Sequence, residues 1–162
     1  MGSISDGRDK PINGFFNQYE FLSNFHPAPV EFEGVIYPTV ENAYQAAKSR
    51  DPKTRERFVN ITPGQAKKLG QEIEIREDWE AVKLGVMFIL LFEKIDEHED
   101  LLEKLVETGN AHLEETNTWD DKYWGVCDGV GENHLGILLM TVRGAIAIER
   151  GIILQCGSSA SS

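Results

Sequence analysis

The pattern of apolar and polar positions changes along the chain from alternation to helical spacing. In residues 29–38, PVEFEGVIYP, apolar and acidic side chains alternate up to Glu33 and Gly34, and the apolar residues VIY follow. Such alternation around a tight turn is typical of a β-hairpin. From residue 39 onward, apolar residues recur at spacings of three and four, as on one face of a helix. The pattern therefore predicts a hairpin followed by helices.

Several helices have recognisable ends in the sequence. Thr39 is a candidate N-cap after Pro38, and Thr62 is another, with Pro63 at the first helical position and Gly70 as the stop. Further helices are predicted over 52–60, from Asp78 to 95, over 98–109 with its end at Gly109, and over 134–150 with Asn133 as its cap. A strand is expected at 112–116. The buried face of the helix from Asp78 is predicted to comprise Trp79, Val82, Val86, Ile89, Leu90 and Phe92.

Together these elements predict a mostly helical α+β fold, a single domain with a small antiparallel sheet. The folded domain is expected over residues 12–150. The flanking residues 1–11 and 151–162 include the Gly/Ser-rich stretches MGSISDG and GSSASS, and we expect a disordered N-terminal tail and a flexible C-terminal tail. The longest apolar run, Val86–Phe92, is far too short for a membrane span, and no signal sequence is apparent. We expect a cytoplasmic protein.

Composition narrows the possible ligands. The formal charge of −11 argues against a broad groove for duplex nucleic acid, because such binding depends on neutralising phosphates. It leaves room for a small phosphorylated ligand or one flipped base, met by a few local Lys and Arg side chains. Cys127 and His134 are too few to predict a metal site, and GxSxG, P-loop and HExxH motifs are absent. We therefore expect no metal and no cofactor.

Residues 17–29, NQYEFLSNFHPAP, fit neither a strand nor a helix. Ser23 and Asn24 break the alternation that a strand needs, and the prolines at 27 and 29 would end a helix. Two interpretations remain for the resulting loop. Its aromatic residues pin it to the core, or Phe21 and Phe25 stack on a flat ligand while the two polar side chains bind its edge.

Another candidate is a polar stripe on the helix that begins at Thr39. Glu41, Tyr44, Gln45 and Lys48 are spaced at i, i+3, i+4 and i+7, which places them on one face. Such a stripe is either a solvent-exposed face or the wall of a site. Glu41 also has a purely structural explanation, because an acid in the first turn gains roughly 0.3–1 kcal/mol from the helix dipole.

The last candidate is the long loop TWDDKYWGVCDGVGENHLG, residues 118–136. A loop of this length in a compact domain is usually functional or disordered, and its aromatic content argues against disorder. Either Trp119 and Trp124 fill the core under a loop whose Asp120 and Asp121 are merely solvated, or the loop contacts a ligand.

Four motifs in order resemble the NADAR family. They are FLSNF at 21–25, YPTVENAYQAAK at 37–48, a W-x3-K-x3-M pattern, and YWG followed by G-x-G-x-N-x-LG-x-LLM-x-VR. The resemblance extends from about Gly14 to Ile148. It implies hydrolysis of the N-glycosidic bond in a ribosylated heterocycle. Early riboflavin-biosynthesis intermediates, ADP-ribosylated guanine and other NAD-derived compounds are the substrate classes it suggests.

The resemblance also implies roles for individual residues. The family's two acids correspond to Glu41 and Asp121, which are the candidate catalytic residues. An anionic carboxylate suits this chemistry because positive charge develops on the sugar as the bond breaks. The candidate substrate-binding residues are Phe21, Phe25 and Trp124 for stacking, Ser23, Asn24 and Asn133 for the base edge, Lys48 and Lys83 for a phosphate, and Tyr44, Trp79, Tyr123 and Gly125.

This sequence departs from the family pattern at two points. Cys127 stands where a glycine is expected, and VEN at 40–42 replaces the SEH of some relatives. Both differences bear on which base is accepted. The expected partner is a small phosphorylated nucleoside-like or ADP-ribose-containing molecule, or a modified base in nucleic acid. Other functions compatible with the sequence are a non-catalytic ADP-ribose-binding module and an acidic regulatory protein that mimics nucleic acid. The sequence makes no prediction about the oligomeric state.

Overall fold

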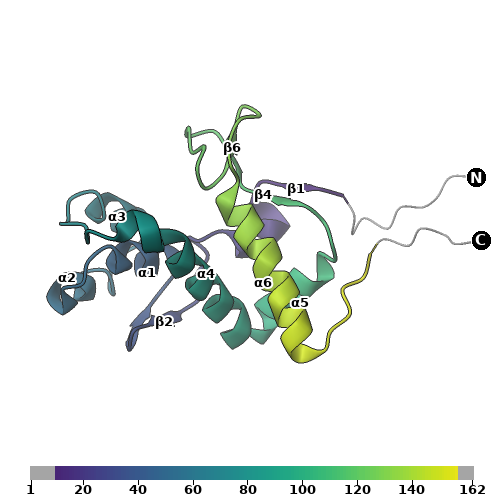
Figure 1. The fold of residues 1–162 in the computed structure, drawn as a ribbon, viewed down its shortest axis with the longest axis horizontal. Helices are drawn as coiled ribbons and strands as arrows, with labels where there is room; N and C mark the ends of the chain where they lie inside the picture. Colours follow the sequence, from purple (N-terminus) through teal and green to yellow (C-terminus); the bar gives the residue numbers. More distant parts are fainter. Residues whose placement is uncertain (1–9, 157–162) are drawn as a thin grey trace, which may run out of the picture. The chain divides into compact units, whose positions relative to one another are not determined.

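The computed structural model describes residues 10–156, so the tail predictions for residues 1–9 and 157–162 lie outside it. Helices dominate the fold, as predicted, and no helix within the described residues is long and apolar enough to cross a membrane. The elements in chain order are β1 (Ile12–Asn13), the 3-10 helix η2 (Asn17–Leu22), β2 (Val30–Phe32), β3 (Val35–Tyr37), α1 (Val40–Ala47), α2 (Pro52–Glu56), α3 (Pro63–Leu69), α4 (Trp79–Glu97), α5 (Glu99–Glu107), β4 (Leu113–Glu114), β5 (Thr116–Asn117), β6 (Val126–Cys127) and α6 (His134–Arg150) (Figure 1).

The chain forms two compact units. One comprises residues 21–98, and the other joins the described N-terminal residues up to Glu20 to the segment that begins at Glu99. The first unit contains the hairpin and helices α1 to α4. The second contains the remaining strands and helices α5 and α6.

The predicted hairpin is confirmed in the first unit. Strands β2 and β3 pair antiparallel, with Val30 opposite Tyr37. Glu33 and Gly34 both adopt positive φ, 48° and 83°, at the turn. Two consecutive positive φ values characterise the turns whose twist matches that of the flanking strands. Burial of Val30, Phe32 and Tyr37 attaches the hairpin to the core.

Helix α1 lies at the centre of the first unit and contacts α2, α3 and α4 (Figure 1). Thr39 is its N-cap, as predicted, and accepts a 3.1 Å hydrogen bond from the backbone N–H of Asn42. The Asn42 side chain, fully buried, donates to the carbonyls of Phe58 and Ile61 at 2.9 and 2.8 Å. These bonds join α1 to the chain between α2 and α3.

The caps of α3 are also as predicted. Thr62 and Gln65 form a capping box, Pro63 occupies the first turn, and Gly70 follows the last residue. Helix α4 begins after Asp78, as predicted, although the Asp78 side chain does not cap it.

The predicted buried face of α4 is wrong in part. Trp79, Val86 and Leu90 are buried, but Ile89 is 55% exposed. Val82 and Phe92 are only half-buried. The buried face instead includes Met87, Leu91, Lys94 and Ile95. Because α4 has apolar residues nearly all the way round, spacing alone does not select the face that packs.

Residues 17–22 correct the prediction that this stretch has no helix. They form one 3-10 helix, and the N–H of Tyr19 donates to the carbonyl of Phe16. The prolines that argued against a helix come at 27 and 29, after this short element has ended.

The predicted small antiparallel sheet is the β2–β3 hairpin, and the second unit adds two pairings that the sequence did not predict. Strand β1 pairs with β4, and β5 pairs with β6, and both two-residue ladders are parallel. The 112–116 strand prediction is confirmed in position by β4 at Leu113–Glu114. Helix α6 contacts β4 and α5. Gly151, with φ of 64°, ends α6 in the left-handed conformation.

Candidate functional site

The fourteen predicted site residues divide between the two units. The first unit contains Phe21, Ser23, Asn24, Phe25, Glu41, Tyr44, Lys48, Trp79 and Lys83. The second unit contains Asp121, Tyr123, Trp124, Gly125 and Asn133.

The polar stripe on α1 is not a solvent face. Glu41 is 8% exposed, and Tyr44 and Gln45 are each 6% exposed. Burying a carboxylate, a phenol and an amide side by side is costly unless each finds hydrogen bonds. Of the two interpretations of this stripe, burial removes the solvent-exposed one and leaves the wall of a site or a buried polar network.

Glu41 is held at both its backbone and its carboxylate. Its N–H donates to the carbonyl of Asn24 at 3.1 Å. This bond satisfies one of the N–H groups that a first helical turn leaves without an intrahelical partner. Its Oε1 accepts a 2.8 Å hydrogen bond from Gln45 Nε2, one turn later. The helix N-terminus and the amide donor both interact favourably with negative charge at this point.

The Lys48 amine is influenced electrostatically by this carboxylate. Burial lowers the pKa of Lys48; the charge of Glu41 acts to raise it, and the charge of Lys83 acts to lower it further. The charges of one acid and one further amine therefore both act on the Lys48 amine. Lys83 Nζ also lies 2.6 Å from Glu80 Oε2.

Two aromatic rings join the same neighbourhood. The rings of Tyr44 and Trp79 are 5.0 Å apart between centroids and tilted by 55°. Lys48 Nζ lies 5.9 Å from the centroid of the Tyr44 ring. The structure thus brings together residues of α1 and the start of α4 that the sequence separates by more than thirty positions.

The FLSNF segment combines features of both of its interpretations. Phe21 and Leu22 are buried, which pins the segment, whereas Phe25 is 43% exposed. The Ser23 hydroxyl accepts a hydrogen bond from the N–H of Phe25 at 3.1 Å. Asn24 Nδ2 lies 3.6 Å from the sulfur of Met87, and Asn24 Oδ1 is buried without a hydrogen-bond partner.

The segment from residue 48 to residue 83 carries a small net positive charge, unlike the chain as a whole. Nine of the sixteen Lys and Arg residues, but only seven of the 27 acids, fall between residues 48 and 83. Within this region a pocket of about 650 Å³ is lined by Arg50, Arg57 and Arg76 together with five carboxylates. The local excess of basic residues contrasts with the acidic chain as a whole.

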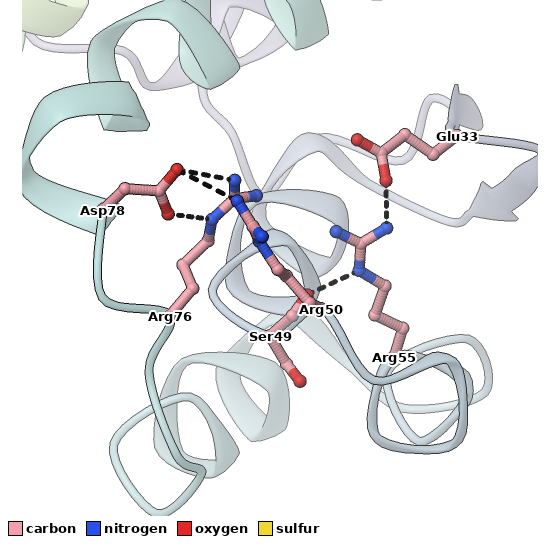
Figure 2. Close-up of polar contacts among 6 residues, drawn as sticks. All are labelled: Glu33, Ser49, Arg50, Arg55, Arg76 and Asp78. Carbon is pink, nitrogen blue, oxygen red and sulfur yellow. Dashed lines mark hydrogen bonds and ion pairs between the residues drawn. The ribbon is translucent and has the colours of Figure 1, made fainter.

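The arginines around this pocket also hold the backbone in place. Arg76 and Arg50 both bind the carboxylate of Asp78, and this lowers the pKa of Asp78 to about 2, chiefly through the Arg76 hydrogen bond (Figure 2). The backbone N–H of Arg76 donates a 2.7 Å hydrogen bond to the backbone carbonyl of Lys48. Arg55 joins Glu33 to the carbonyl of Ser49 (Figure 2).

In the second unit, Asp121 organises the loop around it. Its Oδ1 accepts hydrogen bonds from the N–H groups of Tyr123 and Trp124, at 3.1 and 2.9 Å. Its own backbone is bonded by the side chain of Asn117 on both sides, at 3.1 and 2.8 Å. Asp121 is half-buried. Because its carboxylate and its backbone both form hydrogen bonds within the loop, it is not a merely solvated acid.

The aromatic residues of this loop form a small cluster. The ring of Tyr123 meets that of Trp124 edge-on at 5.0 Å and that of His134 at 4.4 Å. Trp124 is half-buried, whereas Trp119 is 58% exposed. The interpretation of Trp119 as a core residue is therefore wrong.

Asn133 precedes α6, as predicted, but its side chain does not cap the helix. Its Oδ1 accepts from the N–H of Glu115, and its Nδ2 donates to the carbonyl of Leu113. The first turn of α6 is capped by backbone instead, since His134 and Leu135 donate to the carbonyls of Tyr123 and Trp124.

Gly125 has a steric reason to be glycine. A Cβ at this position would lie 2.1 Å from the carbonyl oxygen of Glu115 and 2.7 Å from Asn117 Nδ2. Loop and strand backbone pack too closely here for any side chain. The contacts of Asn133 and Gly125 are with the protein itself, and their contact with substrate stays a prediction.

Within residues 10–156 there is no cluster of three or more His, Cys, Asp or Glu side chains placed to hold a metal ion. Cys127, the residue that departs from the family pattern, is buried, and its sulfur lies 3.9 Å from Asp128 Oδ2.

Sequence reasoning missed two contributors to the first unit. Gln45 belongs to the polar stripe but is not among the predicted site residues, although its i+4 spacing from Glu41 predicts their contact. Lys94 is a lysine on the buried face of α4, 1% exposed. No local signal marks this lysine as buried, because the apolar residues of α4 nearly encircle the helix.

Comparison with known proteins identifies the family. Residues 8–147 match the NADAR domain. The N-glycosidase YbiA of Escherichia coli is 38% identical over 138 residues, which cover 83% of this chain and 86% of that protein. An N-glycosidase of Nostoc punctiforme is 36% identical over 132 residues, covering 77% of this chain and 84% of the relative. The chain belongs to the NADAR family.

Two further comparisons refine this assignment. A riboflavin biosynthesis protein of Vibrio vulnificus is 35% identical over 127 residues, which cover 76% of this chain and 34% of that longer protein. The NMR structure of E. coli YbiA matches with a TM-score of 0.79 at 36% identity, covering 88% of each chain. Relatives similar over most of their length thus support the predicted α+β fold and a hydrolase acting on N-glycosyl compounds.

Proposed function

We propose that this protein hydrolyses the bond between the ribose C1′ and the heterocycle nitrogen of a phosphorylated, ribosylated base. An early riboflavin-biosynthesis intermediate is the first substrate class to test, because one relative is named a riboflavin biosynthesis protein. Water supplies a hydroxyl to C1′ and a proton to the departing nitrogen. The products are the free base and a ribose phosphate.

The buried carboxylate of Glu41 carries this proposal. Cleavage of a ribose–nitrogen bond builds positive charge on the sugar ring, as in glycoside hydrolysis. A preorganised carboxylate stabilises that charge, and its stabilisation is larger where water is excluded. Glu41 is buried and hydrogen-bonded by Gln45, so it is held in one orientation.

Neighbouring residues have matching roles in the proposal. Lys48 and Lys83 bind the phosphate, supported by the excess of basic residues over 48–83. Tyr44, Trp79 and the exposed ring of Phe25 provide apolar surface for the base. Asp121 is proposed as a further acid and Trp124 as a stacking residue. The predicted cytoplasmic location is part of the same proposal.

A base-release assay tests the proposal. The protein is incubated separately with a ribosylamino-pyrimidine 5′-phosphate, a guanine-ADP-ribosylated oligonucleotide and NAD, and free base is measured by mass spectrometry. Glu41→Gln is the matched control: it keeps the shape of the side chain and removes the charge. We expect release from the pyrimidine substrate and a loss of at least about 100-fold in kcat for the variant, roughly 2.7 kcal/mol in barrier.

Other outcomes redirect the assignment. Release only from the modified oligonucleotide or from NAD would move the substrate to the ADP-ribose class. Tight binding of ADP-ribose without base release from any substrate would favour a binding module. Full activity of Glu41→Gln would return Glu41 to a helix-stabilising role.

A further inference from the structure

Lys94 is an unusual residue for the position it occupies. It lies on the buried face of α4, between Leu91 and Ile95, and is 1% exposed. Burial lowers the pKa of its amine to about 7, and no charged neighbour contributes to that shift. Burying an amine without a carboxylate partner is costly. An apolar side chain would fill the same space without that cost, so the amine needs another explanation.

The amine of Lys94 contacts one specific backbone group. Its Nζ donates a 2.9 Å hydrogen bond to the carbonyl of Ser23, 71 residues away in the sequence. The same carbonyl accepts the N–H of His26 at 3.1 Å, which closes a turn over residues 23–26. A carbonyl oxygen has two lone pairs and accommodates both donors.

The turn that Lys94 holds is bonded to the first turn of α1. The next carbonyl along the chain, that of Asn24, accepts the N–H of Glu41 at 3.1 Å. Two adjacent carbonyls of one turn thus accept hydrogen bonds from different helices. The carbonyl of Ser23 accepts from Lys94 of α4, and the carbonyl of Asn24 accepts from Glu41 of α1. The turn also presents the exposed ring of Phe25.

We propose that Lys94 is a positioning residue that fixes the 23–26 turn against the start of α1, so that Asn24 and Phe25 keep a set place beside Glu41. The role in turnover rests on the proposed function, whereas the fixing of the turn does not. Lys94 acts through the Ser23 carbonyl and does not contact substrate.

Amide hydrogen exchange tests the fixing of the turn without any substrate. In Lys94→Met, which keeps the length of the side chain and removes the donor, we expect the Glu41 amide to exchange at least about tenfold faster. The Asn42 amide should be unchanged, because its acceptor is the Thr39 hydroxyl. A purely structural role would accelerate both amides together, and unchanged exchange at Glu41 would overturn the proposal.

Two further variants separate the hydrogen bond from packing. Ile95→Val removes one methylene at a neighbouring buried position and should leave the Glu41 amide protected. Lys94→Gln retains an N–H donor and should restore at least half of the lost protection. Equal exchange in Lys94→Gln and Lys94→Met would show that the donor is not what holds the turn.

Turnover supplies the second measurement. With the ribosylamino-pyrimidine 5′-phosphate, Lys94→Met should lower kcat about tenfold and change KM less than threefold, whereas Ile95→Val should change neither. Unchanged kcat in the folded Lys94→Met variant would contradict the role in turnover. If the wild-type protein releases no base, the proposed function fails, and the exchange rates at Glu41 and Asn42 still decide whether Lys94 fixes the turn.

Discussion

Gln45 Nε2 lies 2.8 Å from Glu41 Oε1, one helical turn along α1, and donates a hydrogen bond to it. Both side chains are more than nine-tenths buried. Gly70 leaves the space that the Gln45 amide oxygen occupies, because a Cβ at position 70 would lie 1.9 Å from its Oε1. The buried amide therefore fits closely into its site and donates to the carboxylate of Glu41.

Replacing Gln45 with methionine should lower kcat for base release by about 10- to 100-fold. Methionine keeps the unbranched shape and removes the donor, and a hydrogen bond to a charged group contributes roughly 1.5–3 kcal/mol. The comparison is kcat and KM against the same change at Gln71, which is exposed. Equal kcat values for Gln45→Met and Gln71→Met would mean that the amide does not orient the acid.

Asp121→Asn should separate the structural from the catalytic role of Asp121. The amide oxygen of asparagine can still accept the N–H groups of Tyr123 and Trp124, so thermal denaturation should give nearly the wild-type Tm. Turnover should fall at least about 100-fold if the charge participates in chemistry. Asp120→Asn, at the exposed neighbouring position, is the control. Wild-type turnover in a folded Asp121→Asn protein would restrict Asp121 to organising the loop.

Trp124→Ala should weaken ligand binding by roughly 1–3 kcal/mol, the range for a ring stacked on a base. Because Trp124 is only half-buried, its loss should cost less stability than the roughly 3–5 kcal/mol typical of a core tryptophan. Calorimetric titration with ADP-ribose and a melting curve measure the two effects. Trp119→Ala, at a 58% exposed site, should alter neither. Early melting with normal affinity would identify Trp124 as a packing residue.

The stability of the protein should rise as the pH increases from about 7 to 9.5. Burial lowers the pKa of Lys94 from 10.5 to about 7, so across this range the unfolded chain binds more protons than the folded one. Under that condition the free energy of unfolding increases with pH, by about 1.4 kcal/mol for each pKa unit traversed. Burial also lowers the pKa of Lys48, which acts in the same direction.

Denaturant titrations of wild type and Lys94→Met across this range check the pH prediction. The variant should be more stable than wild type at pH 7 and should show a much flatter dependence. The titrations stop below pH 10 because of the Tyr37 phenol. Burial raises its pKa in the folded protein, so near pH 10 the phenol loses its proton more readily in the unfolded chain, and this lowers the free energy of unfolding. Identical slopes for the two proteins would contradict the assignment to Lys94.

The resemblance to the NADAR family was readable because its motifs are short and local. FLSNF, the α1 stripe and the YWG loop each consist of neighbouring residues, and each forms an ordered piece of structure. The sequence did not predict which residues these segments contact in the folded protein. The bond from Glu41 to Asn24 and the bond from Lys94 to Ser23 join residues 17 and 71 positions apart in the sequence.

The sequence by itself determined the hairpin turn and most helix boundaries. A turn with two positive φ values favours a glycine such as Gly34, and a cap such as Thr39 acts within three residues, so both signals are local. Tertiary structure decided which face of α4 is buried, because its apolar residues encircle the helix and only packing selects among them. It also decided the parallel pairing of the two-residue strands and the burial of Lys94, since each depends on a partner that no local pattern specifies.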